Sequence, residues 1–240
     1  MVLVAASVGA LVVTGRNGSR SVSAQTAEGR IDAEVGALLA GIPQHGNTLG
    51  QPTAPFTLEI FADLECLTVK NWIVLLLPAV IREFVRSNIV QIQYRSLETD
   101  TEDPTVFLAQ QSAALAAGSQ DKAWNFIEIF YHEQGKEYTP YVTDNYLEGI
   151  ASQVSGLNIS QWISDRTTHL VRQVVADNNT ARNVGFRSTP SFLIGRTGGG
   201  MTKLVGHRVV IDFRNTKTGR QSKAYLVEPG DITEALDRLP

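Results

Sequence analysis

The single cysteine of the chain, Cys66, follows an apolar run at 56–62 that is typical of a strand, and it precedes a segment with helical spacing. At a strand-to-helix junction, unpaired backbone N–H groups and the helix dipole favour a negative charge. The thiolate is the reactive form of cysteine, so this position predicts a nucleophile. A buried, inert thiol is the alternative that position alone leaves open. One cysteine also excludes an internal disulfide and a zinc–cysteine cluster.

Thr189-Pro190 stands directly before the apolar residues 191–194, which are predicted to form a strand. Proline has no N–H to donate, so it suits a strand start or an active-site loop. A cis bond at Pro190 would leave the backbone of Thr189 free to pair with an extended substrate. Thr68, two residues after the cysteine, is a candidate hydrogen-bond donor to the thiolate, and a capping or solvated hydroxyl is the alternative.

Composition and charge narrow the class of protein. The chain has 240 residues, of which 43% are hydrophobic and 19% are charged, as in ordinary globular proteins. The net charge is −3 with no long run of one sign, which disfavours nucleic acid as a partner. The four histidines are scattered, so no metal site is expected. The glycine-rich segment 196–200 is predicted to be a turn, and the basic residues within 203–223 indicate a solvated hairpin or, alternatively, a partner surface.

The first 25 residues resemble a targeting segment. Residues 2–14 form an uncharged apolar run that is too short to span a bilayer comfortably, since spanning takes about 20 residues. The run has the length of a signal-peptide core, and Val22-Ser23-Ala24 offers small residues at the positions that a signal peptidase reads. We therefore expect residues 1–25 to be a signal peptide or a membrane anchor, and the protein to be secreted or membrane-anchored outside the cytoplasm. A buried N-terminal helix or strand is the alternative.

The remaining periodicities predict strands on both sides of a helical block. Residues 26–55 contain a short helix at 31–39 and a turn-rich approach. Apolar residues at helical spacing predict a long helix after Cys66, which Pro78 should kink. Residues 89–97 read as a second strand, parallel to the first through a right-handed crossover.

From 103 to 185 the pattern is helical throughout. The expected helices run from the Asp103 cap to Ala117, over 124–131, from the Thr143 cap to Val154, and over 158–183. After the strand at 191–194, a hairpin is expected between 204–210 and 223–227, and then a short helix capped by Asp231. One α/β domain (56–102 and 186–240) would thus carry an all-helical insertion (103–185).

This order of elements resembles the DsbA-like thiol–disulfide oxidoreductases over about residues 31–240. The resemblance implies an α/β, thioredoxin-like fold with an all-helical insertion, a cis Pro190, activity outside the cytoplasm without a cofactor, and a lowered pKa of Cys66. It also implies protein or small-molecule thiols and disulfides as partners, and a membrane quinone-linked oxidase as a redox partner. The similarity is carried by Asp63-Leu-Glu-Cys66, Leu77-Pro78, Tyr94-Arg95-Ser96-Leu97 and Gly185-Phe-Arg-Ser-Thr-Pro-Ser-Phe192.

Two departures from the family pattern bear on function. The Cys-x-x-Cys motif of the family reads Cys66-Leu67-Thr68-Val69, so valine replaces the resolving thiol. Ile60 stands where relatives often carry a buried acid, and Glu59 should point to the opposite face. Without the second thiol, a link to a membrane oxidase is doubtful.

Two functions of different class follow from this sequence. The first is thiol–disulfide exchange through Cys66 alone, by an exported protein. The second is a redox-inactive module that binds peptides beside Thr189 and Pro190 or acts as a scaffold. A glutathione-transferase relative of the same fold is a distant third, because a soluble transferase would not need the N-terminal apolar run.

Overall fold

The computed structural model describes residues 18–166, 168–214, 219 and 221–239. The apolar run at 2–14, on which the targeting prediction rests, lies outside the described residues. The first described helix is α1 (Gly18–Leu39). No helix within the described ranges is both long and apolar enough to cross a membrane.

A six-stranded sheet in the order β1-β2-β4-β3-β5-β6 forms the centre of the protein. The central strand β3 runs parallel to β4 and antiparallel to β5, so the predicted parallel pair is confirmed. The alternating buried pattern of β4 fits a strand with one face against the core. The strands span Gln44–His45 (β1), Thr48–Leu49 (β2), Phe56–Ala62 (β3), Val90–Ser96 (β4), Ser191–Arg196 (β5) and Met201–Leu204 (β6).

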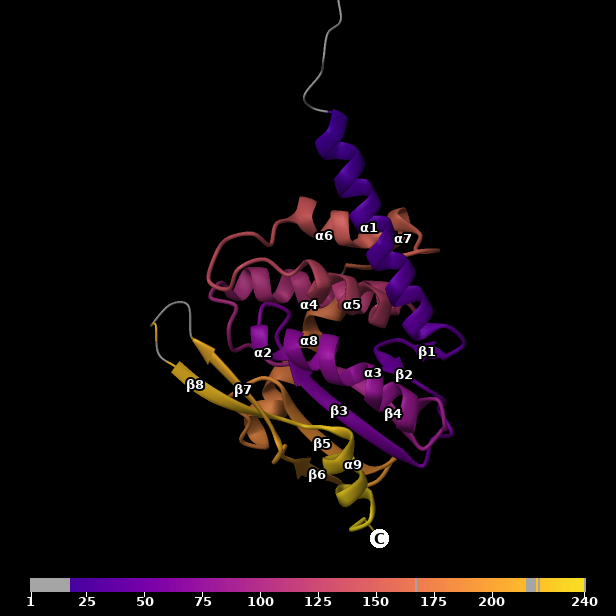
Figure 1. The fold of residues 1–240 in the computed structure, drawn as a ribbon, viewed down its shortest axis with the longest axis vertical. Helices are drawn as coiled ribbons and strands as arrows, with labels where there is room; N and C mark the ends of the chain where they lie inside the picture. The colour runs from indigo at the N-terminus through magenta and orange to yellow at the C-terminus, as the bar shows by residue number, and fades with distance from the viewer. Residues whose placement is uncertain (1–17, 167, 215–218, 220, 240) are drawn as a thin grey trace, which may run out of the picture.

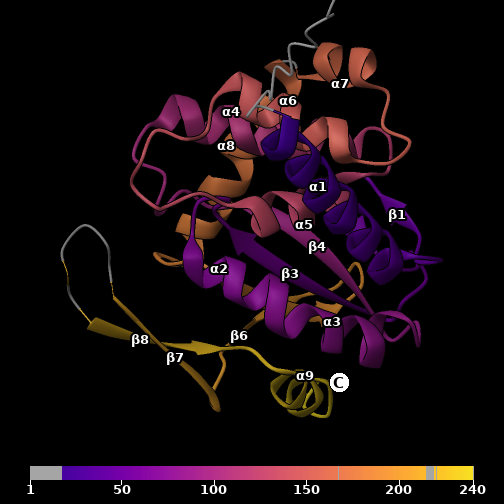
Figure 2. The same cartoon turned by 45° about the horizontal axis from the view of Figure 1, so that its top comes forward.

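The long helix after β3 is continuous but irregular, and it lies across the sheet in Figures 1 and 2. Two π-helical turns interrupt its α-helical geometry. Pro78 occupies the first turn of α3, directly after the first of these π-helical turns. The kink expected at this proline stays a prediction. The segments are α2 (Leu67–Asn71), η1 (Trp72–Leu76), α3 (Leu77–Val80) and η2 (Ile81–Val85).

Five helices lie between β4 and β5. The predicted caps are confirmed, since Asp103 accepts the N–H of Thr105 and Thr143 accepts that of Tyr146. The single helix predicted over 158–183 is wrong. Arg166 leaves the helical region with φ −69° and ψ 67°, which divides the segment into two helices. The helices are α4 (Pro104–Gly118), α5 (Ala123–Glu133), α6 (Asp144–Gln153), α7 (Ile159–Asp165) and α8 (Thr168–Asn183).

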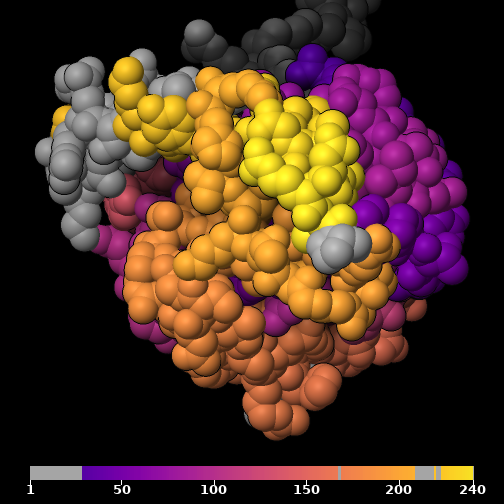
Figure 3. Space-filling view, turned by 90° about the horizontal axis from the view of Figure 1, so that it is seen from below, coloured from indigo at the N-terminus to yellow at the C-terminus, as the bar shows by residue number. Residues whose placement is uncertain are grey.

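The C-terminal part departs from the prediction in two places. Leu204 belongs to β6 of the main sheet, and the hairpin instead pairs β7 (Val209–Arg214) with β8 (Gln221–Leu226). Figures 1 and 2 show this hairpin extending away from the body of the protein. The last helix, α9 (Pro229–Leu236), is capped by Glu228 rather than by Asp231, which completes a capping box from the third helical position. Figure 3 shows α9 in yellow, packed against the orange segments that precede it.

An ion-pair network joins the sheet to the helical block. Arg95 on β4 contacts Glu59 on β3 at 2.8 Å and Asp177 on α8 at 2.6 Å, and all three side chains are at most 20% exposed. Glu59 lies on the face opposite to Ile60, which is fully buried, as the alternation of a strand predicts. The network fixes β4 and α8 on each other, and these elements flank the loop that follows β4.

Replacing Arg95 by leucine should leave the buried carboxylate of Asp177 and the partly buried carboxylate of Glu59 without their cation. We expect Arg95→Leu to lower the free energy of unfolding by about 3 kcal/mol, measured by denaturant titration. Arg82→Leu is the matched control, because Arg82 is 69% exposed and its pair with Glu83 should contribute less than about 0.5 kcal/mol. Equal effects of the two variants would contradict a structural role for the network.

Candidate functional site

Cys66 forms the N-cap of α2, directly after the loop that leaves β3. Its side chain is only 3% exposed, and its thiol donates a hydrogen bond to the carbonyl oxygen of Thr189 at 3.5 Å. The Thr189-Pro190 bond is cis, as expected. The fold therefore brings together Cys66, Thr189 and Pro190, although 123 positions separate the two ends of this contact.

The backbone of Thr189 and the side chain of Thr68 were predicted to bind a partner and to support the thiolate, respectively. The N–H of Thr189 makes no hydrogen bond within the described part of the chain, which leaves it available to an extended partner. Thr68 forms no hydrogen bond with Cys66 among the described residues, so its support of the thiolate stays a prediction.

The carboxylate of Asp63 organises the loops around Cys66. One of its oxygens accepts the backbone N–H groups of Thr99, Asp100 and Thr101 at 2.9, 2.9 and 3.0 Å. The other accepts the hydroxyl of Thr101 at 2.6 Å and the N–H of Glu65 at 3.1 Å. Asp63 is fully buried, and burial raises the pKa of its carboxyl. The five donors hold the loop after β4 against the turn that carries Cys66.

The same loop reaches the segment of the cis proline. The hydroxyl groups of Thr99 and Thr189 lie 2.6 Å apart. Thr99 is itself positioned by its N–H bond to Asp63. Asp63 thus aligns Thr189 with Cys66 through one intermediate residue.

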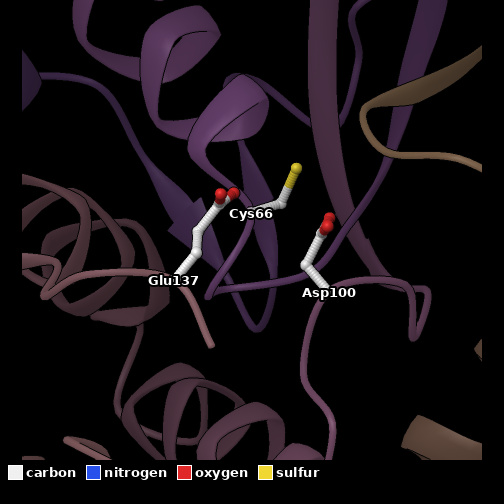
Figure 4. A group of neighbouring side chains, drawn as sticks. All are labelled: Cys66, Asp100 and Glu137. Carbon is white, nitrogen blue, oxygen red and sulfur yellow. The ribbon is translucent and has the colours of Figure 1, made fainter. Parts of the chain in front are cut away.

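Two further carboxylates face the sulfur, Asp100 from the loop after β4 and Glu137 from the connection between α5 and α6. Their oxygens and the Cys66 sulfur all lie within 4.8 Å of one another, and Figure 4 shows both carboxylates turned toward the cysteine. Glu137 accepts the N–H of Leu67 at 2.7 Å. It thereby occupies the helix end that was expected to stabilise the thiolate. Asp100 accepts the hydroxyl of Tyr138 at 2.9 Å.

The expected lowering of the thiol pKa is wrong for this structure. Burial raises the pKa of Cys66 well above its usual range, and the negative charge of Asp100 raises it further. Hydrogen bonds from Thr189 and from the N–H of Val69 act in the opposite direction and are outweighed. The thiol is therefore neutral at physiological pH in this arrangement.

Cys66, Asp100 and Glu137 could together supply three ligands to one metal ion. A thiolate and carboxylates are ligands that Zn²⁺ accepts in proteins. Both carboxylates already accept hydrogen bonds from protein groups, from Tyr138 to Asp100 and from Leu67 to Glu137.

The residues that sequence reasoning missed are the acids around the thiol. Asp63 stood in the motif that carried the resemblance, but its five-donor role depends on a loop more than 30 residues away. Asp100 and Glu137 belong to no motif, and their approach to Cys66 is set by tertiary packing. The one available signal was the run Glu98-Thr-Asp-Thr-Glu-Asp103, an acidic segment directly after a predicted strand.

The sequence is similar to a thioredoxin family model and to two Bacillus proteins. The family model described as "Thioredoxin" matches residues 44–199. "Probable disulfide bond formation protein D" of Bacillus anthracis is 23% identical over 149 residues, which cover 61% of this chain and 68% of that protein. The protein of the same description from Bacillus cereus is 22% identical over the same length.

Solved structures show the same fold. Oxidised BdbD from Bacillus subtilis matches with a TM-score of 0.60 at 15% identity, over 82% of this chain and 96% of that one. Wolbachia pipientis alpha-DsbA1 matches with a TM-score of 0.58 at 17% identity, over 83% and 90%. The predicted α/β, thioredoxin-like fold with a helical insertion is thus confirmed.

Replacing Asp63 by asparagine should disturb the loop that it holds. The asparagine amide keeps one acceptor oxygen, but its NH₂ group would face the N–H and O–H groups that donate to Asp63 in the native protein. We therefore expect the free energy of unfolding to fall by about 2 kcal/mol. Asp121→Asn is the control, because Asp121 is exposed and accepts one backbone N–H. Denaturant titration of both variants measures the difference, and an unchanged midpoint for Asp63→Asn would contradict its organising role.

Removing the charge of Asp100 should make Cys66 more acidic. In Asp100→Asn we expect the midpoint of Cys66 alkylation against pH to fall, and the rate at neutral pH to rise several-fold, because a carboxylate no longer opposes the thiolate. Glu148→Gln removes an equal charge from an exposed position on α6 and should leave the midpoint unchanged. A midpoint that does not move in Asp100→Asn would show that Asp100 has no effect on the thiol.

Proposed function

We propose that this chain, which belongs to the thioredoxin family, exchanges thiols and disulfides through Cys66 as its single reacting sulfur. The observation that carries the proposal is the contact between the Cys66 thiol and the Thr189 carbonyl, directly beside the cis Pro190. It combines a cysteine at a helix start with an adjacent backbone segment that can hold an extended partner.

The exchange step requires the thiolate. Cys66 loses its proton, and its sulfur attacks one sulfur of a partner disulfide along the axis of the S–S bond. A new disulfide forms between Cys66 and the partner, the original S–S bond breaks, and the leaving thiolate takes up a proton. Sulfur is neither oxidised nor reduced overall. Because the chain has no second cysteine, the mixed disulfide persists until an outside thiol attacks it.

Thr189 and Pro190 provide the proposed binding edge for the partner. The unused N–H of Thr189 can donate to a carbonyl of an extended polypeptide, as in the addition of a strand to an exposed edge. A partner must displace some of the residues that shield Cys66 from solvent, because the cysteine is only 3% exposed.

Partners, location and domain division follow from the relatives and the sequence. Two Bacillus relatives are described as probable disulfide bond formation proteins, which supports disulfide-bearing proteins as substrates here. We place this chain outside the cytoplasm, with residues 1–25 as its signal peptide or membrane anchor. Residues 103–185 act as the helical insertion domain of a thioredoxin-like domain made of 56–102 and 186–240. A membrane redox partner would have to act on the mixed disulfide rather than on an internal one.

The second candidate is a redox-inactive module that binds peptides in the same place. Its specific support is the raised pKa of Cys66, together with the fully buried Ile60 at the position of the family's acid. In that case the Thr189 edge would bind a partner and Cys66 would take no part in chemistry.

A small neutral disulfide distinguishes the two functions. After incubation with bis(2-hydroxyethyl) disulfide at mildly alkaline pH, intact mass should show one thioethanol group on Cys66, which remains until a free thiol is added. Cys66→Ser should give no adduct. A wild-type protein that stays unmodified while folded, but reacts once unfolded, would favour the redox-inactive module.

Val69→Cys should restore the resolving thiol. Val69 is fully buried in α2, three residues after Cys66 and at the position of the family's resolving thiol, so a cysteine here can attack the mixed disulfide. We expect the adduct to disappear and the mass to fall by two hydrogens as an internal disulfide forms. Ser87→Cys, in the exposed turn that follows η2, adds a thiol without resolving the adduct. Persistence of the Cys66 adduct in Val69→Cys would contradict the proposed geometry.

A further inference from the structure

A cavity of about 210 Å³ is lined by Glu65, the residue before the cysteine, and by residues of the helical block. It has room for several water molecules, each of which occupies roughly 30 Å³ in the liquid, and hence for the end of one long side chain. Its polar lining carries three acids, and none of the described residues that line it is basic. The lining residues are Glu65, Thr101, Glu102, Asp103, Val106, Tyr138, Thr139, Pro140 and Val142.

Glu65 is a buried carboxylate that lines this cavity and lacks a cation. Glu65 is 5% exposed, and among the described residues no cationic side chain forms an ion pair with it. The hydroxyl of Thr101 interacts with Glu65, but this hydroxyl has a single proton and donates to Asp63 at 2.6 Å. Burial and the charges of Asp63, Asp100 and Glu102 raise the pKa of Glu65 to about 7. A buried carboxylate among other acids is a position where a positive charge would be stabilised.

The cavity is joined to the reacting sulfur through short contacts. Glu65 precedes Cys66 in the chain, and Tyr138, which lines the cavity, donates its hydroxyl to Asp100 at 2.9 Å. A carboxylate oxygen of Asp100 in turn lies within 4.8 Å of the Cys66 sulfur and of a Glu137 oxygen. Figure 4 shows these three side chains together. Thr189 contacts the same sulfur. A polypeptide held at Thr189 with its disulfide at Cys66 would therefore have residues close to its reacting cysteine within reach of the cavity.

We infer that the cavity beside Glu65 binds a lysine or arginine side chain located close to the reacting cysteine of a partner polypeptide. This inference rests on the proposed function, and it specifies the substrate class. The cation would pair with Glu65 in the cavity, with Glu102 and Asp103 adding negative charge to the lining. Its positive charge would also offset the carboxylates that oppose the thiolate of Cys66. Binding of the correct partner and activation of the thiol would thus depend on the same charge.

The test compares unstructured peptides that differ in a single charge. Each peptide carries one cysteine as a mixed disulfide with 2-thioethanol, and either arginine or its neutral analogue citrulline at a position scanned on both sides of that cysteine. At physiological salt we expect one position at which the arginine peptide forms the adduct with Cys66 about tenfold faster than the citrulline peptide. The ratio of the two rates cancels any change in the intrinsic reactivity of the thiol.

Two variants of the cavity and one control test whether the cavity causes the faster reaction of the arginine peptide. Glu65→Gln should reduce the rate ratio to about twofold or less, because only the general negative field remains. Thr139→Lys, which places a cation on the cavity wall from an irregular segment, should reduce it as well and guards against misfolding of the first variant. Glu83→Gln removes an exposed charge on η2 and should leave the ratio unchanged. A ratio near one in the wild type, or one that survives both cavity variants, would overturn the inference.

A binding measurement separates this inference from the exchange function. Fluorescence anisotropy of labelled, cysteine-free versions of the peptides with Cys66→Ala protein reports the cavity without any chemistry. Tighter binding of the arginine peptide that is lost in Cys66→Ala/Glu65→Gln would support the cavity even where no exchange occurs. Equal binding of the arginine and citrulline peptides, with exchange intact, would refute the cavity and leave the proposed function standing.

Discussion

The carboxylate of Asp63 is the constraint on which the site depends. Five donors from two loops converge on it, so the turn that carries Cys66 and the loop after β4 form a single hydrogen-bonded unit. A fully buried carboxyl is costly without such bonds, and here almost all of its acceptor capacity is used. The position of Asp100 beside the sulfur and that of Thr99 beside Thr189 both follow from this unit. The acid that builds the site is thus also the reason that another acid faces the thiol.

The electrostatic consequence opposes the ordinary logic of a reactive cysteine. A thiol at a helix start is made acidic by unpaired N–H groups and by nearby cations. In this protein, Glu137 takes the N–H of Leu67, and Asp100 adds a second negative charge close to the sulfur. Burial acts in the same direction and is the largest contribution to the raised pKa of Cys66. Cys66 still lies at the N-terminus of α2, but the negative charges of Glu137 and Asp100 offset the positive end of the helix before a thiolate forms.

Local patterns predicted the framework of this site and not its chemistry. Apolar alternation and helical spacing located β3, the helix after Cys66 and the caps at Asp103 and Thr143, because these depend on neighbours in sequence. The break at Arg166 was missed, since a single residue outside helical geometry leaves the apolar period on both sides intact. Glu137 reaches Leu67 from 70 positions away, a contact that no periodicity encodes. The sign of the pKa shift at Cys66 depended on such contacts, and therefore the expectation taken from the family had the wrong sign.

The replacement of the second thiol by Val69 and the charges around Cys66 are mutually consistent. A dithiol site gains from an acidic first thiol, because the stability of the reduced pair sets its oxidising power. Without a resolving thiol that advantage is absent, and a thiol kept mostly neutral reacts more slowly with small disulfides at neutral pH, since the thiolate is the attacking form. The free energy needed to ionise Cys66 must then come from a partner that brings positive charge or excludes the carboxylates from the sulfur. In such a site selectivity resides in activation, because a partner without the matching charge reacts with the thiol more slowly.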